Sequence, residues 1–252
     1  MEPSGRHRPL VVRRCYCSSV ALPPRSITDR ARITGMDVTI YFDIDGTLLH
    51  RADHDDDITG AADAFDLSID EAAISLYKGL VDQYFQRNAA DPYRQGIEHW
   101  AEHHGFDVDP EAVTEELKRT QIEDTRTKDG LRDTLDAIDD RATLGILTNG
   151  AGDMQREKLD RHDLSHFFET ALISGETDSV KPRDGFFEAA KDRLPADRHV
   201  YVGDRIGTDI VPACENDFLA VLVGDRSPPA DRTVESVSQL SAGPLVESSD
   251  SD

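Results

Sequence analysis

Two aspartates that follow a short apolar run are the residues best suited to chemistry in this chain of 252 residues. Asp43 and Asp45 come directly after Val38–Phe42, whose β-branched and aromatic composition predicts a buried strand. Side chains two positions apart lie on the same side of an extended chain, and Gly46 then allows a sharp turn. Two such carboxylates repel each other unless a cation is bound, and hard oxygen ligands favour Mg²⁺. We therefore expect a Mg²⁺ site here, completed by a third acid from elsewhere in the chain. The alternative is a surface turn rich in aspartate.

The chain after Asp129 alternates between strand and helix patterns, which predicts a parallel sheet. The expected strands span residues 142–147, 171–174, 199–202 and 219–223. The expected helices lie around 131–138, at about 153–161 and around 186–194. Ligands of parallel sheets bind at the carboxyl ends of the strands. Polar residues that follow these strands are therefore candidates for the same site as Asp43: Thr148, Lys181, Asp204 and Asp209.

Residues 51–128 lack a chemical motif and have the pattern of helices. Ser68–Glu71 resembles a capping box ahead of a helix, and Pro92 can begin the next one. Asp109 and Pro110 together offer an N-cap and a proline in the first turn of a third helix. An all-helical insert of this size predicts a cap domain over the site.

The composition limits the class of protein. A net charge of −22 argues against nucleic-acid binding by the main body, and no apolar run reaches the length that spans a membrane. Aspartate far outnumbers glutamate, and 22 arginines stand against six lysines. This bias is typical of halophilic proteins, with an acidic mesophilic protein as the alternative. Three cysteines form no disulfide framework or zinc set, so a cytoplasmic location is expected.

Both ends of the chain differ from the middle. Residues 1–35 are rich in arginine and proline and poor in acids, which predicts a disordered basic extension that is not the native start. A transit peptide or a basic arm that binds nucleic acid are the alternatives. From residue 227 to 252, proline, serine and acidic residues accumulate, and we expect an acidic C-terminal tail in solvent.

Taken in order, Asp43 with Asp45, Thr148, Lys181, and Asp204 with Asp209 resemble the four motifs of the haloacid dehalogenase superfamily of phosphohydrolases. The resemblance covers about residues 36–224, and the helical insert lies where that superfamily has its first cap type. It implies an α/β fold, with a Rossmann-like parallel-sheet core formed by 36–50 and 129–226 and an inserted all-α cap at 51–128.

The resemblance also implies a role for each residue. Asp43 matches the nucleophile that forms an aspartyl-phosphate, and Asp45 matches the general acid and base. Mg²⁺ would be held by Asp43, by the backbone carbonyl of Asp45 and by Asp204, while Asp209 would orient metal-bound water. Phosphate would be bound by the Thr148 hydroxyl, the Asn149 backbone amide and Lys181, and Lys181 would also restrain Asp43.

The expected function is a Mg²⁺-dependent phosphatase that hydrolyses a small-molecule phosphate monoester. Asp45 separates this chain from true dehalogenases, which lack the second aspartate because their leaving group needs no proton. ATP-driven pumps of the superfamily have Lys-Thr-Gly-Thr where Ile44–Thr47 stands here. A phosphomutase of the same fold remains an alternative, as does a non-catalytic binding protein. No nucleic-acid or membrane partner is expected, and the substrate and oligomeric state stay open.

Overall fold

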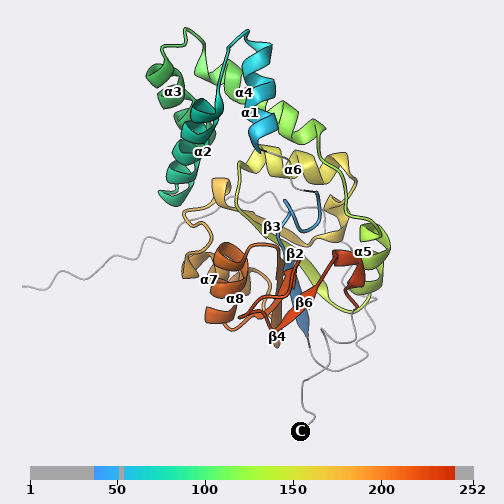
Figure 1. Ribbon diagram of the computed structural model, residues 1–252. Coiled ribbons are helices and arrows are strands. Elements are labelled where there is room, and N and C mark those ends of the chain that lie inside the picture. The colour runs from blue at the N-terminus through green and yellow to red at the C-terminus, as the bar shows by residue number, and fades with distance from the viewer. Residues whose placement is uncertain (1–36, 51–53, 242–252) are drawn as a thin grey trace, which may run out of the picture.

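A parallel sheet of six strands is the centre of the protein (Figure 1). The computed structural model describes residues 37–50 and 54–241. The strand order is β3-β2-β1-β4-β5-β6, and every neighbouring pair is parallel. The strands are β1 Val38–Phe42, β2 Thr143–Thr148, β3 Thr170–Ile173, β4 Arg198–Gly203, β5 Leu219–Val223 and β6 Arg232–Val234. Because β2 and β4 lie on opposite sides of β1, the chain reverses its direction across the sheet at β1, which is where open α/β sheets bind ligands.

Helices cover both faces of this sheet. The core helices are α5 Leu131–Asp139, α6 Gly152–Arg161, α7 Asp184–Arg193 and α8 Val211–Glu215. Leu135 of α5 and Leu159 of α6 belong to the hydrophobic cluster on one face, whereas Phe187 of α7 and Ala213 of α8 belong to the cluster on the other. The result is three layers, with helices on either side of the strands (Figure 1).

The residues of β1 explain why two layers of helices are needed. All five are buried, and successive side chains of a strand point to opposite faces. Val38, Ile40 and Phe42 pack in the first cluster, whereas Tyr41 packs in the second and donates its hydroxyl to the Ala190 carbonyl at 2.7 Å. A strand that is apolar on both sides is stable only where both sides are covered.

Four helices between β1 and α5 form a separate unit, seen at the top of Figure 1. They are α1 His54–Ala64, α2 Glu71–Gln86, α3 Pro92–His104 and α4 Pro110–Glu123. Their apolar faces form their own cluster around the fully buried Trp100. The chain segments that enter and leave this unit are paired: His50 donates to the Arg126 carbonyl at 2.8 Å, and Lys128 donates to that of Leu48 at 2.9 Å. These helices are placed on the core by two adjacent connections.

Two details of the sequence prediction were wrong. Asp70, and not Ser68, caps α2, because its carboxylate accepts from the Ala73 amide at 2.9 Å. The predicted tail of 227–252 is also wrong in its first half: β6 extends the sheet, and Val237 and Leu240 are buried in the core. The predicted extension at 1–35 lies outside the described residues.

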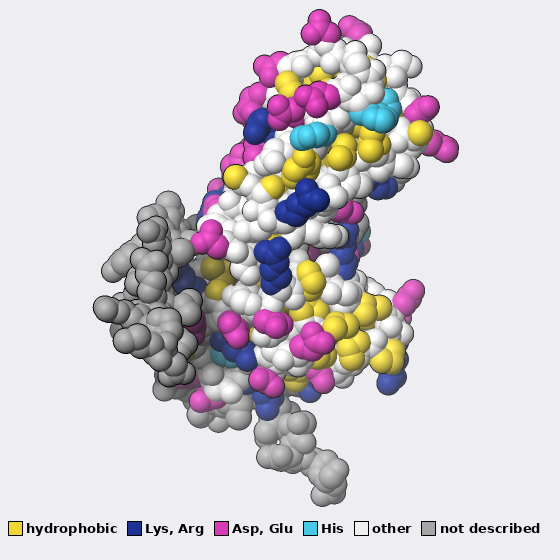
Figure 2. Space-filling view, turned by 90° about the vertical axis from the view of Figure 1, so that its left-hand side faces the viewer, with side chains coloured by type: hydrophobic (Ala, Val, Ile, Leu, Met, Phe, Trp, Pro, Cys, Tyr) yellow, Lys and Arg dark blue, Asp and Glu magenta, His cyan; other side chains and the backbone are white. Residues whose placement is uncertain are grey.

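Figure 2 shows aspartate and glutamate side chains over both the helical unit and the core, and a hollow in the surface between the two. Within the described residues, no helix combines the length and the apolar character that crossing a bilayer requires.

Candidate active site

The polar residues selected from the sequence meet at one edge of the sheet. Asp43 follows β1, Thr148 ends β2, and Asp204 follows β4. Lys181 comes from the segment between β3 and α7. Because β2, β1 and β4 are neighbours and parallel, their carboxyl ends lie side by side, and the topology alone brings these residues together.

Asp43 is buried, and its carboxylate is held from one side. The Thr148 hydroxyl donates to its Oδ1 at 2.7 Å, and the Lys181 ammonium donates to the same oxygen at 3.0 Å. Among the described residues, no hydrogen bond reaches Oδ2. The pKa of Asp43 is raised, chiefly by burial and further by Asp209, against the opposing effects of Lys181 and Thr148. The carboxylate is therefore oriented by two donors to one oxygen, and its other oxygen is left for a further interaction.

Lys181 has a partner for each of its three N–H groups. They donate to Asp43 Oδ1, to Asp209 Oδ1 at 2.7 Å and to the Tyr201 hydroxyl at 2.7 Å. Burial lowers the pKa of Lys181, but the charges of Asp209 and Asp43 raise it more, so the pKa lies above its usual value. The pKa of Tyr201 is also raised well above its usual value, by burial first, and its hydroxyl donates to the Leu147 carbonyl at 2.9 Å. The side chain of Lys181 is thus a fully bonded cation.

Asp209 lies on the helical turn Ile206–Ile210, which follows β4. Its Oδ2 accepts from the Arg205 amide at 2.9 Å, and only 1% of the residue is exposed. Gly203 makes this position possible, because a Cβ there would lie 2.6 Å from that of Asp209. Glycine is therefore needed at the end of β4, because Asp209 packs directly against the strand and leaves no room for a side chain.

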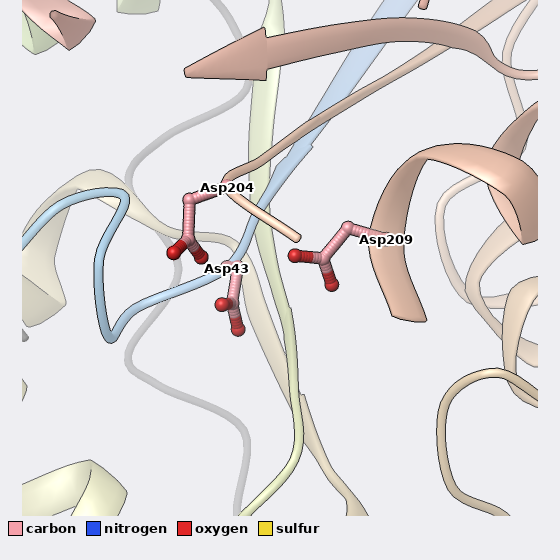
Figure 3. A group of neighbouring side chains, drawn as sticks. All are labelled: Asp43, Asp204 and Asp209. Carbon is pink, nitrogen blue, oxygen red and sulfur yellow. The ribbon is translucent and has the colours of Figure 1, made fainter. Parts of the chain in front are cut away.

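Among the described residues, one group of three acids could hold a metal ion: Asp43, Asp204 and Asp209. Each offers a carboxylate oxygen, and these oxygens lie within 4.8 Å of one another. Figure 3 shows the three side chains converging from the end of β1, from the end of β4 and from the turn after it. The three carboxylates are hard oxygen donors, and Lys181 is the ammonium described beside them. Such ligands suit Mg²⁺. The donor set gives no support to a zinc or redox-metal site, which would use cysteine or histidine.

The carboxylate of Asp45 is not in that group. Both of its oxygens accept from the Lys158 ammonium at 2.9 Å, and Oδ2 also accepts from the Gln155 amide at 2.9 Å. Neither Lys158 nor Gln155 was predicted from the sequence to belong to the site. A signal was available, since lysine is rare in this chain and residues 155 and 158 share one face of the helix that follows Thr148.

Asn149 and Tyr201 have roles that the sequence did not predict. The Asn149 side chain donates to the Lys181 carbonyl at 3.0 Å and accepts from the Lys181 amide at 2.9 Å. This pair of bonds joins the loop after β2 to the segment that carries Lys181. Tyr201 lies within β4, where its aromatic ring is indistinguishable from a core residue in the sequence. Only the tertiary fold brings its hydroxyl to the ammonium of Lys181, which lies 20 residues earlier in the chain.

The helical unit approaches the same place. The pKa of Tyr93, in α3, is raised by burial first and then by the charge of Asp45 among others. Asn88, just beyond α2, donates to the Thr177 carbonyl of the core at 3.2 Å. Helix α3 and the end of α2 therefore approach the edge of the sheet where the acids converge.

Removal of the central cation should destabilise the fold. Lys181→Met leaves two buried carboxylates, Asp43 and Asp209, without their shared partner, and such a loss costs about 3–5 kcal/mol in the free energy of unfolding. Urea denaturation in the presence of a chelator measures it. Lys191→Met is the matched control, because Lys191 is 31% exposed and its carboxylate partner, Asp217, is 3.8 Å away, so less than about 1 kcal/mol is expected. Equal losses in the free energy of unfolding of the two variants would show that the buried ammonium of Lys181 stabilises the fold no more than an exposed one.

Known proteins share parts of this sequence and its overall fold. The chain is 35% identical over 91 residues to the glyceraldehyde 3-phosphate phosphatase of Methanothermobacter thermautotrophicus, a match to 35% of this chain and 40% of that protein. It is 30% identical over 118 residues to the pyrimidine 5'-nucleotidase YjjG of Escherichia coli, a match to 46% of this chain and 52% of that protein. The chain therefore spans about half or less of the length of the curated relatives it matches.

The fold is shared more widely. A 2-haloacid dehalogenase from Pseudomonas syringae superposes with a TM-score of 0.63 over 81% of this chain and 96% of that one, at 23% identity. At that identity the superposition is evidence of a shared fold only. The model of the haloacid dehalogenase-like hydrolases matches residues 38–213, a span that includes every candidate site residue. This protein belongs to the haloacid dehalogenase-like hydrolase family.

Proposed function

We propose that the protein is a Mg²⁺-dependent phosphatase that hydrolyses a small-molecule phosphate monoester through an aspartyl-phosphate. The observation that carries the proposal is the convergence of Thr148 and Lys181 on one oxygen of Asp43, beside the acid Asp204. A carboxylate with one oxygen fixed and one available is suited to attack, and the donors around it suit an anionic group.

In the first step, Asp43 forms a bond to phosphorus while the bond from phosphorus to the ester oxygen breaks. Asp45, which carries a proton in the complex with the ester, gives that proton to the departing oxygen, which leaves as an alcohol. When the ester binds, the Thr148 hydroxyl and the Lys181 N–H that orient Asp43 would turn from its carboxylate to the phosphoryl oxygens, where negative charge develops. The products of this step are the alcohol, the aspartyl-phosphate and an ionised Asp45.

In the second step, a water attacks phosphorus and the bond between phosphorus and Asp43 breaks. Asp45 takes the proton of the attacking water and returns to its starting state. Mg²⁺ would be held by Asp43, the Asp45 carbonyl and Asp204, with Asp209 beside them, and when bound it neutralises charge on the transferring phosphoryl group. Free phosphate and the intact enzyme complete the cycle.

Helices α1–α4 act as a cap over this site in our proposal, so that residues 51–128 decide which ester fits. The hollow between the helices and the core (Figure 2) and the proximity of Tyr93 to Asp45 support it. The relatives named above act on a triose phosphate and on nucleotides, by their names. A small phosphorylated sugar or a nucleoside monophosphate is therefore the first class to test.

The experiment is release of inorganic phosphate from glyceraldehyde 3-phosphate, other sugar phosphates, nucleoside monophosphates and phosphoglycolate, in high KCl with Mg²⁺. We expect turnover with Mg²⁺, its loss on addition of EDTA and its return when Mg²⁺ is restored, because the clustered acids need a cation. Undiminished turnover in excess EDTA would contradict the metal assignment.

Two alternatives are tested by analysing the products of these reactions and by adding 2-chloropropionate to the panel of substrates. A phosphomutase would yield an isomeric phosphate ester with little free phosphate. A dehalogenase would release chloride from 2-chloropropionate and leave the phosphate esters intact. The presence of Asp45 favours the phosphatase over the dehalogenase, since a halide leaves without a proton.

A further inference from the structure

Two side chains of α6, Lys158 and Gln155, hold the carboxylate of Asp45. Lys158 contacts both of its oxygens at 2.9 Å, and the Lys158 side chain is only 3% exposed, against 27% for Asp45. A lysine buried to this extent requires a partner. Among the described residues, Asp45 is the carboxylate that pairs with it. The ion pair therefore fixes the carboxylate from its buried side.

Gln155 supports the same carboxylate with a second donor. Its Nε2 lies 2.9 Å from Asp45 Oδ2 and 2.9 Å from the Asn149 carbonyl, and both of these partners are acceptors. The amide can therefore face them only with its nitrogen. Its Oε1 is buried and accepts no hydrogen bond from the described residues. The orientation of Gln155 is thus set by what it donates to.

Helix α6 is a rigid carrier for these two side chains. Leu159 packs in the hydrophobic cluster of the core, and Met154 packs in the cluster of the helical unit. Arg156 also forms two bonds, of 2.8 and 2.7 Å, to the carboxylate of Glu176. A helix anchored on several sides holds its side chains with little freedom.

We propose that Lys158 and Gln155 are positioning residues that hold the Asp45 carboxylate in the orientation needed for proton transfer. The inference rests on the proposed role of Asp45. Neither residue touches the substrate in this account, since both act through the one carboxylate that they share. The alternative is that the ion pair only stabilises the fold, and the two ideas differ in what they predict for different leaving groups.

The test compares Lys158→Met in two single-turnover reactions: 4-nitrophenyl phosphate, and the alkyl phosphate that the unmodified protein hydrolyses fastest. Methionine retains most of the apolar stem and removes both hydrogen bonds. Misplacement of a catalytic group costs about 10²-fold, so release of the alcohol should slow by about that factor. Release of nitrophenolate, which leaves without a proton, should slow far less. Gln155→Met should show the same pattern with a smaller loss.

Lys118→Met is the matched control. Lys118 is also largely buried and bridges to α6 through Asp153 at 3.3 Å, but it does not contact Asp45. Its substitution should leave the ratio of the two ester rates unchanged. A melting curve of each variant shows that it is folded.

A double substitution separates positioning from stability. If Lys158 acts through Asp45, adding Lys158→Met to Asp45→Asn should change the alkyl rate by less than about threefold, because interacting residues are not additive. Equal losses on both esters, or a full further loss in the Asp45→Asn background, would overturn the inference and leave the proposed function standing. If Asp45→Asn itself had no effect on either ester, the proposed role of Asp45 would fail, and the inference with it.

Discussion

Asp43→Asn should abolish turnover of every phosphate ester, with a loss on the order of 10⁶-fold in kcat, as expected when a covalent nucleophile is removed. Asparagine has nearly the shape of aspartate and can still accept from Thr148 and Lys181 through its amide oxygen. It has no second carboxylate oxygen to form a bond to phosphorus. The loss should therefore be independent of the leaving group, and no phosphoenzyme should form.

The same substitution should not weaken the fold. Burial and the neighbouring Asp209 raise the pKa of Asp43, so its charged form is costly in the absence of a metal. A neutral side chain removes that cost, and Lys181 keeps Asp209 as a partner. Thermal melts in a chelator should give a melting temperature no lower than that of the unmodified protein. Asp217→Asn, at a 96% exposed side chain, is the control for activity and should leave it unchanged. Turnover within tenfold of normal in Asp43→Asn would exclude Asp43 as the nucleophile.

The sheet was predictable because its strands are apolar and lie in the order that βαβ units require. The strands predicted at 142–147 and 219–223 form β2 and β5. The order of the strands then follows from the reversal at β1, which no local pattern encodes. β6 was missed because it has three half-buried residues at the edge of the sheet, and the burial of Val237 depends on contacts with the distant α5.

The candidate site was predictable where a residue follows a strand, and not elsewhere. Asp43, Thr148 and Asp204 are each read from the end of an apolar run, and the structure brings them to one edge of the sheet. Tyr201 and Lys158 reach the site from the middle of β4 and of α6. From the sequence, Tyr201 looks like a core aromatic residue and Lys158 like part of a solvated helix face. Their partners, Lys181 and Asp45, lie 20 and 113 residues away in the chain, so no local pattern reveals the contacts.

Asp45→Asn should separate the two steps of the proposed reaction. The amide oxygen can still accept from Lys158, whereas the NH₂ group that replaces the other oxygen cannot, and the side chain can neither give nor take a proton. Alkyl phosphates, whose alkoxides need a proton to leave, should be slowed by about 10²–10⁴-fold. With 4-nitrophenyl phosphate the first step should be nearly normal, because nitrophenolate leaves unaided. Hydrolysis of the aspartyl-phosphate would still lack its base, so the phosphoenzyme should accumulate.

Pre-steady-state kinetics by rapid quench, with the substrate in excess over the enzyme, measure both parts of this result. In Asp45→Asn, 4-nitrophenyl phosphate should give a burst of nitrophenolate of up to one equivalent per site, followed by a slow steady state. The alkyl ester should give no burst, since its first step is the slow one. Asp43→Asn, treated in the same way, should give no burst with either ester. Because the burst requires a nucleophile and a missing base together, its absence in Asp45→Asn, with equal losses on both esters, would exclude Asp45 as the acid and base.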